Sequence, residues 1–312
     1  MARMTLDQLR IFLVVAEQLH FTRAAEILYM TQSSVSAAVQ NLEESYGIKL
    51  FSRVGRRIEI TEAGRLLYHE AQKILEQVDL TERGLQELNN LQRGELKLGS
   101  SLTIGNYWLP QKISLFKQRY PRIDISCTLA NTAEIIAGTA HGLFDMSFIE
   151  GEVDEKSKNC LQQEVVGGDH LRLLVGQPHP WFVVDSVPVS ALLTTSWVMR
   201  EQGSGTRAIF ERTLKAWGIN PDELNIILEM NSGEMVKAVV ESGVGATVLS
   251  ELMVKKELQV QSLAAIAIHN SATESLSICR SFKLLRSLCR FQTKASQVFR
   301  LMLVESSGLL EQ

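Results

Sequence analysis

The sequence predicts an α/β protein with an N-terminal all-α winged helix-turn-helix domain, a long linker helix and two Rossmann-like subdomains. Three observations predict this architecture. Two short amphipathic helix patterns lie close together at residues 22–46, an unbroken helical pattern of leucines covers 61–91, and strand patterns alternate with helix patterns from residue 95 onward. A chain of 312 residues also has the length for two or three domains.

The predicted domain boundaries follow these three patterns. The winged helix-turn-helix domain covers residues 1–60, with the helix-turn-helix at about 21–40, and the linker or dimerisation helix covers 61–92. The α/β domain covers 93–312, with subdomain I at about 93–166 and 270–312 and subdomain II at about 167–269.

Composition limits the classes of function. The formal net charge is −3, so any affinity for nucleic acid must come from a local basic patch. The start has no signal-peptide pattern and no apolar stretch is long enough to span a membrane, so we expect a cytoplasmic bacterial protein. None of the four cysteines has C-x-x-C spacing. We expect reduced structural thiols, with a redox-sensing pair as the alternative.

The first domain is expected to contain three helices. The first covers residues 6–19, where Thr5 and Gln8 form a capping-box pattern. The second covers 22–28 and the third 32–46, which Gly47 ends.

Small polar residues begin the third helix, as in a helix that enters the major groove. Gln32 can contact adenine in a bidentate manner, and the neighbouring hydroxyls can contact phosphates or base edges. The alternative is that Thr31 and Ser34 only cap the helix, and both roles are compatible. The predicted DNA-contacting residues of this helix are Thr31, Gln32, Ser33, Ser34 and Ser36.

A β-hairpin wing is predicted over residues 48–60, with a turn around Val54 and Gly55. Three arginines, Arg53, Arg56 and Arg57, lie at its tip. Guanidinium groups beside a recognition helix can neutralise phosphates and release counterions. The alternative is an ordinary solvated basic turn.

The long helix is predicted from residue 61 to about 91, because leucine, isoleucine and valine recur at three- and four-residue steps. A helix of this length spans about 45 Å at ~1.5 Å per residue. The small preceding domain cannot bury its apolar side, so we expect it to pair with a second copy in a homodimer.

From residue 95, strands are expected at 95–99, 123–129, 144–149, 171–175, 196–199, 226–229, 246–249 and 275–284. Helices are expected at 103–120, 132–142, 206–217, 233–241 and 294–304. This alternation predicts βαβ units in a mostly parallel sheet, with a ligand cleft between the subdomains at the carboxyl ends of the strands.

Polar helix starts follow three of the predicted strands. The glycine-rich turn at 200–207 is a weak signal on its own, and a plain strand-to-helix turn is its simpler interpretation. Because such starts recur in both subdomains, we predict that they converge on a small anionic metabolite carrying carboxylate, phosphate or sulfate. The predicted effector-binding residues are Ser100, Ser101, Thr103, Asn131, Thr132, Arg200, Gly203, Ser204 and Thr206.

Catalysis finds little support in the sequence. No G-x-S-x-G, P-loop lysine or H-E-x-x-H pattern occurs, so we assign no catalytic residue, metal ligand or cofactor. Two alternatives to a DNA-binding regulator are a cytoplasmic solute-binding protein and an enzyme that uses the G-S-G-T turn as a phosphate cup. Neither a solute-binding protein nor such an enzyme would need the helix pair or the long helix.

The order of these elements resembles that of the LysR-type transcriptional regulators over essentially the whole chain. The motifs that carry the resemblance are F-T-R-A-A-E-I-L (21–28), T-Q-S-S-V-S (31–36), L-E-E-S-Y-G (42–47), L-F-S-R (50–53) and the T-E-A-G start of the linker. In the second half, F-D-M-S-F-I-E-G (144–151) and R-E-Q-G-S-G-T-R (200–207) resemble the branch that regulates sulfur assimilation and carbon fixation.

The resemblance implies subdomains of the periplasmic-binding-protein type and a homotetramer, built as a dimer of dimers, on promoter DNA. It also implies that an inducer in the cleft shifts the subdomains and changes DNA bending, with control of the protein's own gene or a divergent operon. The sequence departs from the family after Ser36, where Ala37, Ala38, Gln40 and Asn41 replace frequent basic residues. Phosphate contact is therefore expected to depend on the wing arginines.

Overall fold

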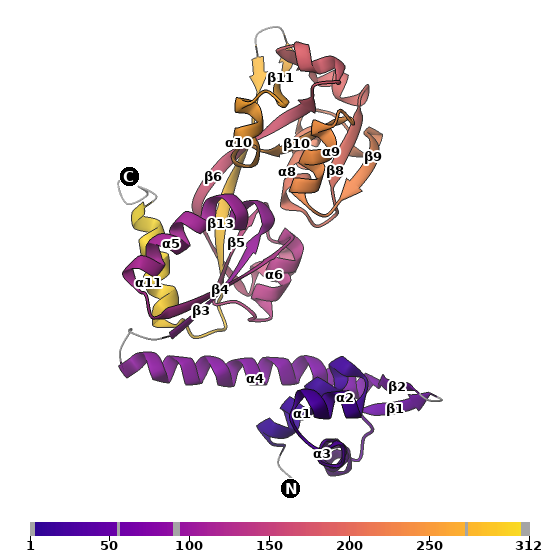
Figure 1. The fold of residues 1–312 in the computed structure, drawn as a ribbon, viewed down its shortest axis with the longest axis vertical. Coiled ribbons are helices and arrows are strands. Elements are labelled where there is room, and N and C mark those ends of the chain that lie inside the picture. The colour runs from indigo at the N-terminus through magenta and orange to yellow at the C-terminus, as the bar shows by residue number, and fades with distance from the viewer. Residues whose placement is uncertain (1–3, 55–56, 90–93, 272–273, 307–312) are drawn as a thin grey trace. The chain divides into compact units, whose positions relative to one another are not determined.

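The computed structural model describes residues 4–54, 57–89, 94–271 and 274–306 of the chain. It divides into two compact units, one up to Leu85 and one from Gln86 onward (Figure 1). Among the described residues, no helix has the length and apolar composition needed to cross a bilayer.

The first unit contains three helices and a hairpin. The helices are α1 (Leu6–Gln18), α2 (Phe21–Ile27) and α3 (Gln32–Tyr46). The predicted capping box is confirmed, since the Gln8 amide donates to the Thr5 hydroxyl and the Thr5 amide donates to the Gln8 side chain. Gly47 ends α3 in the left-handed conformation at φ 65°, which glycine adopts without strain.

One apolar core holds these helices together. Phe12, Val15, Val35 and Leu42 are fully or almost fully buried, and Ala24 lets α2 approach closely because its side chain is a single methyl group. The turn between α2 and α3 includes Tyr29, which has a φ of 54° and an exposed ring.

The hairpin pairs β1 (Phe51–Val54) with β2 (Arg57–Ile60) in antiparallel register, so that Phe51 lies opposite Ile60. It leads into the long helix α4 (Glu62–Asn89). The Thr61 hydroxyl accepts the Gly64 amide at 3.0 Å and donates to the Lys49 carbonyl, which fixes the start of α4 against the hairpin.

The second unit is built on one large sheet with the strand order β4-β3-β5-β13-β6-β10-β8-β9. Its strands are β3 (Gly94–Ser101), β4 (Ile123–Ala130), β5 (Met146–Glu150), β6 (Leu161–Gly176), β7 (Ser186–Pro188), β8 (Ser196–Arg200), β9 (Asn225–Met230), β10 (Ala246–Ser250), β11 (Leu263–Ser271), β12 (Glu274–Leu276) and β13 (Ile278–Ser287).

Helices pack against the strands in both halves of this strand order. They are α5 (Leu109–Arg119), α6 (Thr132–Ala140), α7 (Glu155–Lys158), α8 (Gly205–Ala216), α9 (Gly233–Glu241), α10 (Glu251–Gln259) and α11 (Lys294–Ser306). Short turns of tighter or wider helix are η1 (Ile104–Trp108), η2 (Pro180–Val183), η3 (Val189–Leu193) and η4 (Pro221–Glu223).

The unit has two lobes with separate cores. Lobe I comprises β3, β4, β5, α5, α6 and α11, and its core includes Phe116, Phe148 and Phe299. Lobe II comprises β8, β9, β10, α8, α9 and α10, and its core includes Trp197 and Phe210. Strands β6 and β13 run from one lobe into the other (Figure 1).

The expectation of a mostly parallel sheet was wrong. Within each lobe the strands are parallel, but β6 and β13 are antiparallel to each other and to β10 and β5, respectively. The reason is connectivity, because the chain crosses between lobes twice and returns in the opposite direction. The crossing strand β6 is accordingly much longer than the predicted strand at 171–175, and the predicted strand at 275–284 is divided between β12 and β13.

The helix predicted at 103–120 also differs from the structure. It begins with the wide turn η1, after which α5 begins at Leu109 with Pro110 in its first turn. Proline lacks an amide proton, so its position in the first turn costs no helical hydrogen bond.

Candidate DNA-binding surface and effector site

The start of α3 is exposed where the sequence predicts contact with DNA. Gln32, Ser33 and Ser34 are exposed, and Val35 and Val39 point into the core. Thr31 is the N-cap, and its hydroxyl accepts the Ser34 amide at 3.2 Å. One face of α3 therefore holds the domain together while the other presents amide and hydroxyl groups to solvent.

Hydroxyl contacts order this exposed turn. The Thr31 hydroxyl lies 3.0 Å from the Ser33 hydroxyl and 2.7 Å from that of Ser34. Thr31 therefore caps α3 while the hydroxyls of this turn remain exposed to solvent, so the two predicted roles are compatible. Gln32 forms none of these contacts, and Ser36 is half-buried one turn further along the helix.

Glu43 joins α3 to the hairpin. Its carboxylate accepts the Leu50 amide at 2.8 Å, the Phe51 amide at 3.2 Å and the Lys49 ammonium at 2.6 Å. Burial acts to raise the pKa of Glu43, but the hydrogen bonds from Lys49, Leu50 and Phe51 outweigh burial and lower it. Glu43 therefore fixes the entry of β1 relative to α3.

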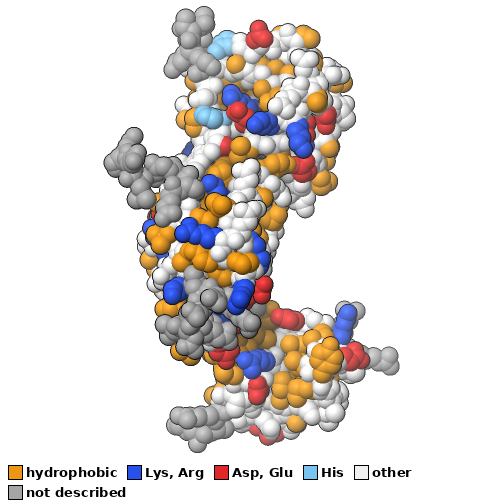
Figure 2. Space-filling view, turned by 60° about the vertical axis from the view of Figure 1, so that its left-hand side comes forward, with side chains coloured by type: hydrophobic (Ala, Val, Ile, Leu, Met, Phe, Trp, Pro, Cys, Tyr) orange, Lys and Arg blue, Asp and Glu red, His pale blue; other side chains and the backbone are white. Residues whose placement is uncertain are grey.

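The backbone of two wing arginines is placed on the hairpin. Arg53 lies in β1 opposite Ile58, and Arg57 lies in β2 opposite Val54, so both flank the tip. The third, Arg56, lies outside the described residues. Figure 2 shows basic and acidic side chains interspersed on the face that it draws, in keeping with the net charge of −3.

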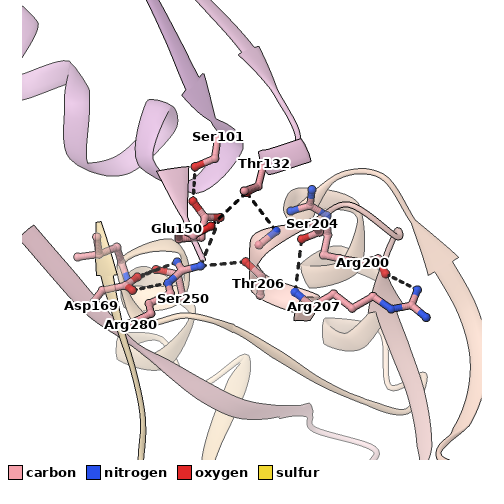
Figure 3. Close-up of polar contacts among 12 residues, drawn as sticks. Ser101, Thr132, Glu150, Asp169, Arg200, Ser204, Thr206, Arg207, Ser250 and Arg280 are labelled. Carbon is pink, nitrogen blue, oxygen red and sulfur yellow. Dashed lines mark hydrogen bonds and ion pairs between the residues drawn. The ribbon is translucent and has the colours of Figure 1, made fainter. Parts of the chain in front are cut away.

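The predicted effector site lies where strands of both lobes end. Ser101 ends β3 and Glu150 ends β5 in lobe I, while Arg200 ends β8 and Ser250 ends β10 in lobe II. Strands β3 and β5 are parallel, as are β8 and β10, so their carboxyl ends point the same way within each lobe. Figure 3 shows the polar groups from both sets meeting.

A buried ion-pair network forms the centre of this meeting point. Arg280 on β13 donates through Nε to Oδ1 of Asp169 on β6, and through Nη2 to Oδ2 at 2.9 Å. The Ser250 hydroxyl also donates to Asp169. The Nη1 atom of Arg280 lies 3.4 Å from Glu150 Oε1 and donates to the Thr206 hydroxyl at 3.0 Å. Arg280 therefore bridges lobe I and lobe II.

Direct contacts between the lobes lie beside this network. The Gly205 amide donates to the Thr132 hydroxyl at 3.1 Å, and the Ala133 amide donates to the Gly203 carbonyl at 3.2 Å. A Cβ at position 205 would come within 2.6 Å of the Thr132 hydroxyl, so only glycine permits this approach. The starts of α6 and α8 thus touch each other across the lobe boundary.

Several predicted residues have partners within the protein. Ser101 donates to Glu150, Ser204 caps α8, and Asn131 caps α6 in a capping box with Glu134. The Ser100 hydroxyl donates to the Ser101 carbonyl. The Arg200 guanidinium is buried and donates through Nε and Nη2 to Glu201, at 2.7 and 2.9 Å. Thr103 is almost fully buried, one residue before η1.

A cavity of about 260 Å³ opens between the lobes. Three predicted residues, Thr132, Gly203 and Ser204, contribute to its lining. A larger cavity of about 570 Å³ lies over α5 and β4, and none of the predicted effector-binding residues lines it. The inter-lobe cavity is therefore the better match to the predicted site.

The sequence interpretation missed the charged residues of the network: Glu150, Asp169 and Arg280. Glu150 occupies the strand end within F-D-M-S-F-I-E-G, a position that could have identified it. Asp169 and Arg280 lie on crossing strands, and no local pattern signals them. Within the described part of the chain, no group of three or more His, Cys, Asp or Glu side chains is placed to hold a metal ion.

Comparisons with known proteins agree with this architecture. Residues 6–65 match the bacterial regulatory helix-turn-helix protein of the lysR family, and residues 89–307 match the LysR substrate binding domain. A protein of Synechocystis sp. described as "Probable RuBisCO transcriptional regulator" is 34% identical over 295 residues, which cover 95% of this chain and 84% of that protein. A counterpart from Porphyra purpurea is 33% identical over 95% of this chain and 92% of its own length.

Solved structures share the fold. Full-length CbnR complexed with its target DNA superposes with a TM-score of 0.71 at 18% identity, covering 97% of this chain and 99% of that one. The regulatory domain of CcmR from Synechocystis, in complex with 2-PG, gives a TM-score of 0.60 at 22% identity, over 69% of this chain and 97% of that domain. The relatives named for RuBisCO regulation support the carbon-fixation side of the predicted resemblance. The chain therefore belongs to the LysR family and is a LysR-type transcriptional regulator, not an enzyme.

Proposed function

We propose that this regulator binds promoter DNA by inserting the start of α3 into the major groove while the wing contacts the adjacent phosphates. The observation that carries the proposal is the division of α3, whose Gln32 and Ser33 are exposed while Val35 and Val39 are buried. A helix that was polar but packed inward could not reach base edges.

The attachment of the wing supports the same proposal. Glu43 binds the amides of Leu50 and Phe51, so the hairpin bearing Arg53 and Arg57 starts at a fixed place beside α3. Groups that contact phosphates must keep register with groups that contact bases. Gel retardation on the upstream region of the protein's own gene tests the proposal, with salt-sensitive binding expected.

We further propose that one target is a promoter of carbon-fixation genes. This rests on the relatives named for RuBisCO regulation. Retardation of RuBisCO-operon upstream DNA at lower protein concentration than a scrambled fragment is the expected result. Equal retardation of both fragments would contradict it.

The ligand proposed for the inter-lobe cavity is a small anion bearing carboxylate or phosphate. Support comes from Thr132 and Ser204, which line this cavity of about 260 Å³. Further support comes from the Arg280 guanidinium and the Thr206 hydroxyl, which meet at the same lobe boundary, and from the 2-PG bound by the CcmR regulatory domain. The proposed contacts are Ser100, Ser101, Thr103, Asn131, Thr132, Arg200, Gly203, Ser204 and Thr206. A thermal-shift titration with 2-PG and inorganic phosphate tests the proposal, because a ligand that binds only the folded state raises the melting temperature.

A homodimer through α4 is proposed, with a homotetramer as the form on DNA. Leu66 and Ile74 on α4 are 67% and 42% exposed, which leaves an apolar strip uncovered. The strip borders an apolar groove of about 360 Å³ that also includes Leu42, Tyr46 and Ile48. Sedimentation should show a dimer or tetramer, and Leu66→Glu together with Ile74→Glu should shift it to the monomer. We place the protein in the cytoplasm on promoter DNA.

A further inference from the structure

Two donors at the lobe boundary, the predicted effector contact Ser101 and the guanidinium of Arg280, are already used by a side chain of the protein itself. The Glu150 carboxylate is 3% exposed, accepts a hydrogen bond from the Ser101 hydroxyl and lies 3.4 Å from Nη1 of Arg280. A hydroxyl and a guanidinium around a carboxylate form the environment that proteins offer to anionic ligands. Glu150 therefore occupies an anion-binding position at the boundary between the lobes (Figure 3).

The rest of the network would survive the departure of Glu150. Asp169 holds Arg280 through Nε and Nη2, and Ser250 holds Asp169 in turn. The Nη1 atom lies 3.4 Å from Glu150 Oε1, and it also donates to Thr206. Removal of the Glu150 carboxylate would free one guanidinium N–H and one hydroxyl while the guanidinium stayed in place.

Charge balance decides whether a second anion can enter beside Glu150. The buried centre holds two carboxylates, those of Glu150 and Asp169, against the single guanidinium of Arg280. A third negative group would add repulsion at close range in a site shielded from water. An anionic ligand that uses Arg280 must therefore take the place of Glu150.

We propose that Glu150 is the specificity-determining residue of the effector site, an internal carboxylate that a carboxylate or phosphate group of the effector displaces. The inference rests on the anionic effector proposed above. It names the atoms for which the ligand competes with the Glu150 carboxylate, Ser101 Oγ and Arg280 Nη1. It also explains why both atoms already have Glu150 as a partner in the structure.

Displacement of the Glu150 side chain would also affect contacts with lobe II. A Cβ on Gly205 would lie 2.8 Å from Cγ of Glu150, so the Glu150 side chain packs closely against the start of α8. The Glu150 carbonyl is also 3.4 Å from the Thr132 hydroxyl, which binds the Gly205 amide. Movement of Glu150 therefore alters the contact between the lobes, which links ligand entry to lobe arrangement.

Chemical rescue of full-length Glu150→Ala tests the proposal. The variant empties the carboxylate position and leaves Ser101 and Arg280 available. We expect 50 mM acetate, and separately 50 mM inorganic phosphate, to raise the melting temperature of Glu150→Ala by about 3–5 °C at constant ionic strength, and that of wild type by less than about 1 °C. Equal shifts in both proteins, or no shift in the variant, would overturn the proposal.

Affinity for 2-PG provides the second measurement, on a variant that keeps the shape of the side chain. Glu150→Gln removes the competing charge, so calorimetry should show 2-PG binding about tenfold tighter than to wild type. Glu155→Gln removes an equal charge from an exposed residue of α7, whose partner is Lys158, and should leave the affinity unchanged. Equal affinities for wild type and Glu150→Gln would contradict the role of Glu150, while leaving the anionic effector itself intact.

The two proposals fail in different ways. If acetate, phosphate and 2-PG stabilise none of the proteins, both the displacement of Glu150 and the anionic effector are wrong. Wild type that binds 2-PG as tightly as Glu150→Gln refutes only the displacement. A cooperative melting transition in each variant checks that the second unit, which contains Glu150 and Glu155, is folded.

Discussion

The carboxylate of Glu43, near the end of α3, accepts the backbone amide of Leu50 at 2.8 Å. Leu50 lies directly before β1, so this bond connects the recognition helix to the wing. The Phe51 amide joins the same carboxylate, and both amides are buried with it. The spatial relation between helix and wing thus depends largely on one side chain.

Glu43→Ala should weaken both the fold of the first unit and its affinity for DNA. The substitution leaves two buried amides without an acceptor, and we expect a loss of about 2 kcal/mol of stability. Circular dichroism should show a lower melting temperature, and gel retardation a weaker complex. Glu44→Gln is the matched control, because Glu44 is exposed and its carboxylate accepts only the Gln40 side chain among the contacts that the structure shows. Equal behaviour of the two variants would contradict the role of Glu43.

The pKa of Glu43 predicts a dependence on pH. Its folded-state pKa is lowered from the ordinary value of 4.5, so the ionised form is favoured in the folded protein. The corresponding stabilisation is fully present above pH 4.5 and is lost as the pH falls through the folded-state pKa. Melting temperatures measured from about pH 6 to about pH 3 should fall less in Glu43→Gln than in wild type. Parallel curves would refute the assignment.

Gln32→Ala should reduce sequence discrimination more than general affinity. A bidentate contact to adenine contributes about 1–3 kcal/mol of discrimination against the wrong base. Competition gel retardation should therefore show specific DNA losing its advantage over non-specific DNA by about tenfold or more. Gln118→Ala, an exposed glutamine of the second unit, should bind like wild type. An unchanged specificity ratio in Gln32→Ala would exclude base contact by this residue.

The wing arginines predict a change in salt dependence. Replacement of Arg53, Arg56 and Arg57 by alanine should flatten the plot of log affinity against log salt by about one unit for each phosphate that is no longer neutralised. Fluorescence anisotropy from about 50 to about 300 mM KCl measures this slope. A slope equal to that of wild type would mean that the wing does not bind phosphates.

Thr206→Ala should weaken the response to 2-PG and preserve DNA binding without it. Thr206 accepts a hydrogen bond from Arg280 at 3.0 Å, and removal of a hydrogen bond to a charged group costs about 1.5–3 kcal/mol. Calorimetry with 2-PG measures the change. Thr213→Ala is the control, because Thr213 lies on the same helix but donates only to the Ile209 carbonyl among the contacts that the structure shows. Identical titrations for both variants would remove Thr206 from the site.

Local patterns predicted the features that depend on neighbours in sequence. The capping box of Thr5 and Gln8, the Thr31 cap and the Gly47 terminus are confirmed, because each depends on residues a few positions apart. Polar helix starts such as Ser204 were also predictable, since a cap precedes the helix that it caps.

Pairings between residues far apart in the sequence could not be predicted, because local patterns describe only neighbouring residues. Asp169 and Arg280 are 111 residues apart and meet only because β6 and β13 cross between the lobes. The antiparallel crossing itself could not be deduced from alternating strand and helix patterns, which describe order along the chain and not return paths. The guanidinium of Arg200 pairs with the adjacent Glu201. The glycine-rich motif that contains Arg200 therefore did not reveal which partner its side chain contacts.

Photo-crosslinking at the start of α3 tests the central claim most directly. A photo-crosslinking amino acid at the position of Ser33 should attach the full-length protein to bases within the major groove of promoter DNA, at positions protected in a footprint. The same amino acid at the position of Gln118, on α5, should give no crosslink. Absence of crosslinks from position 33 in a complex that still retards promoter DNA would contradict the recognition-helix account.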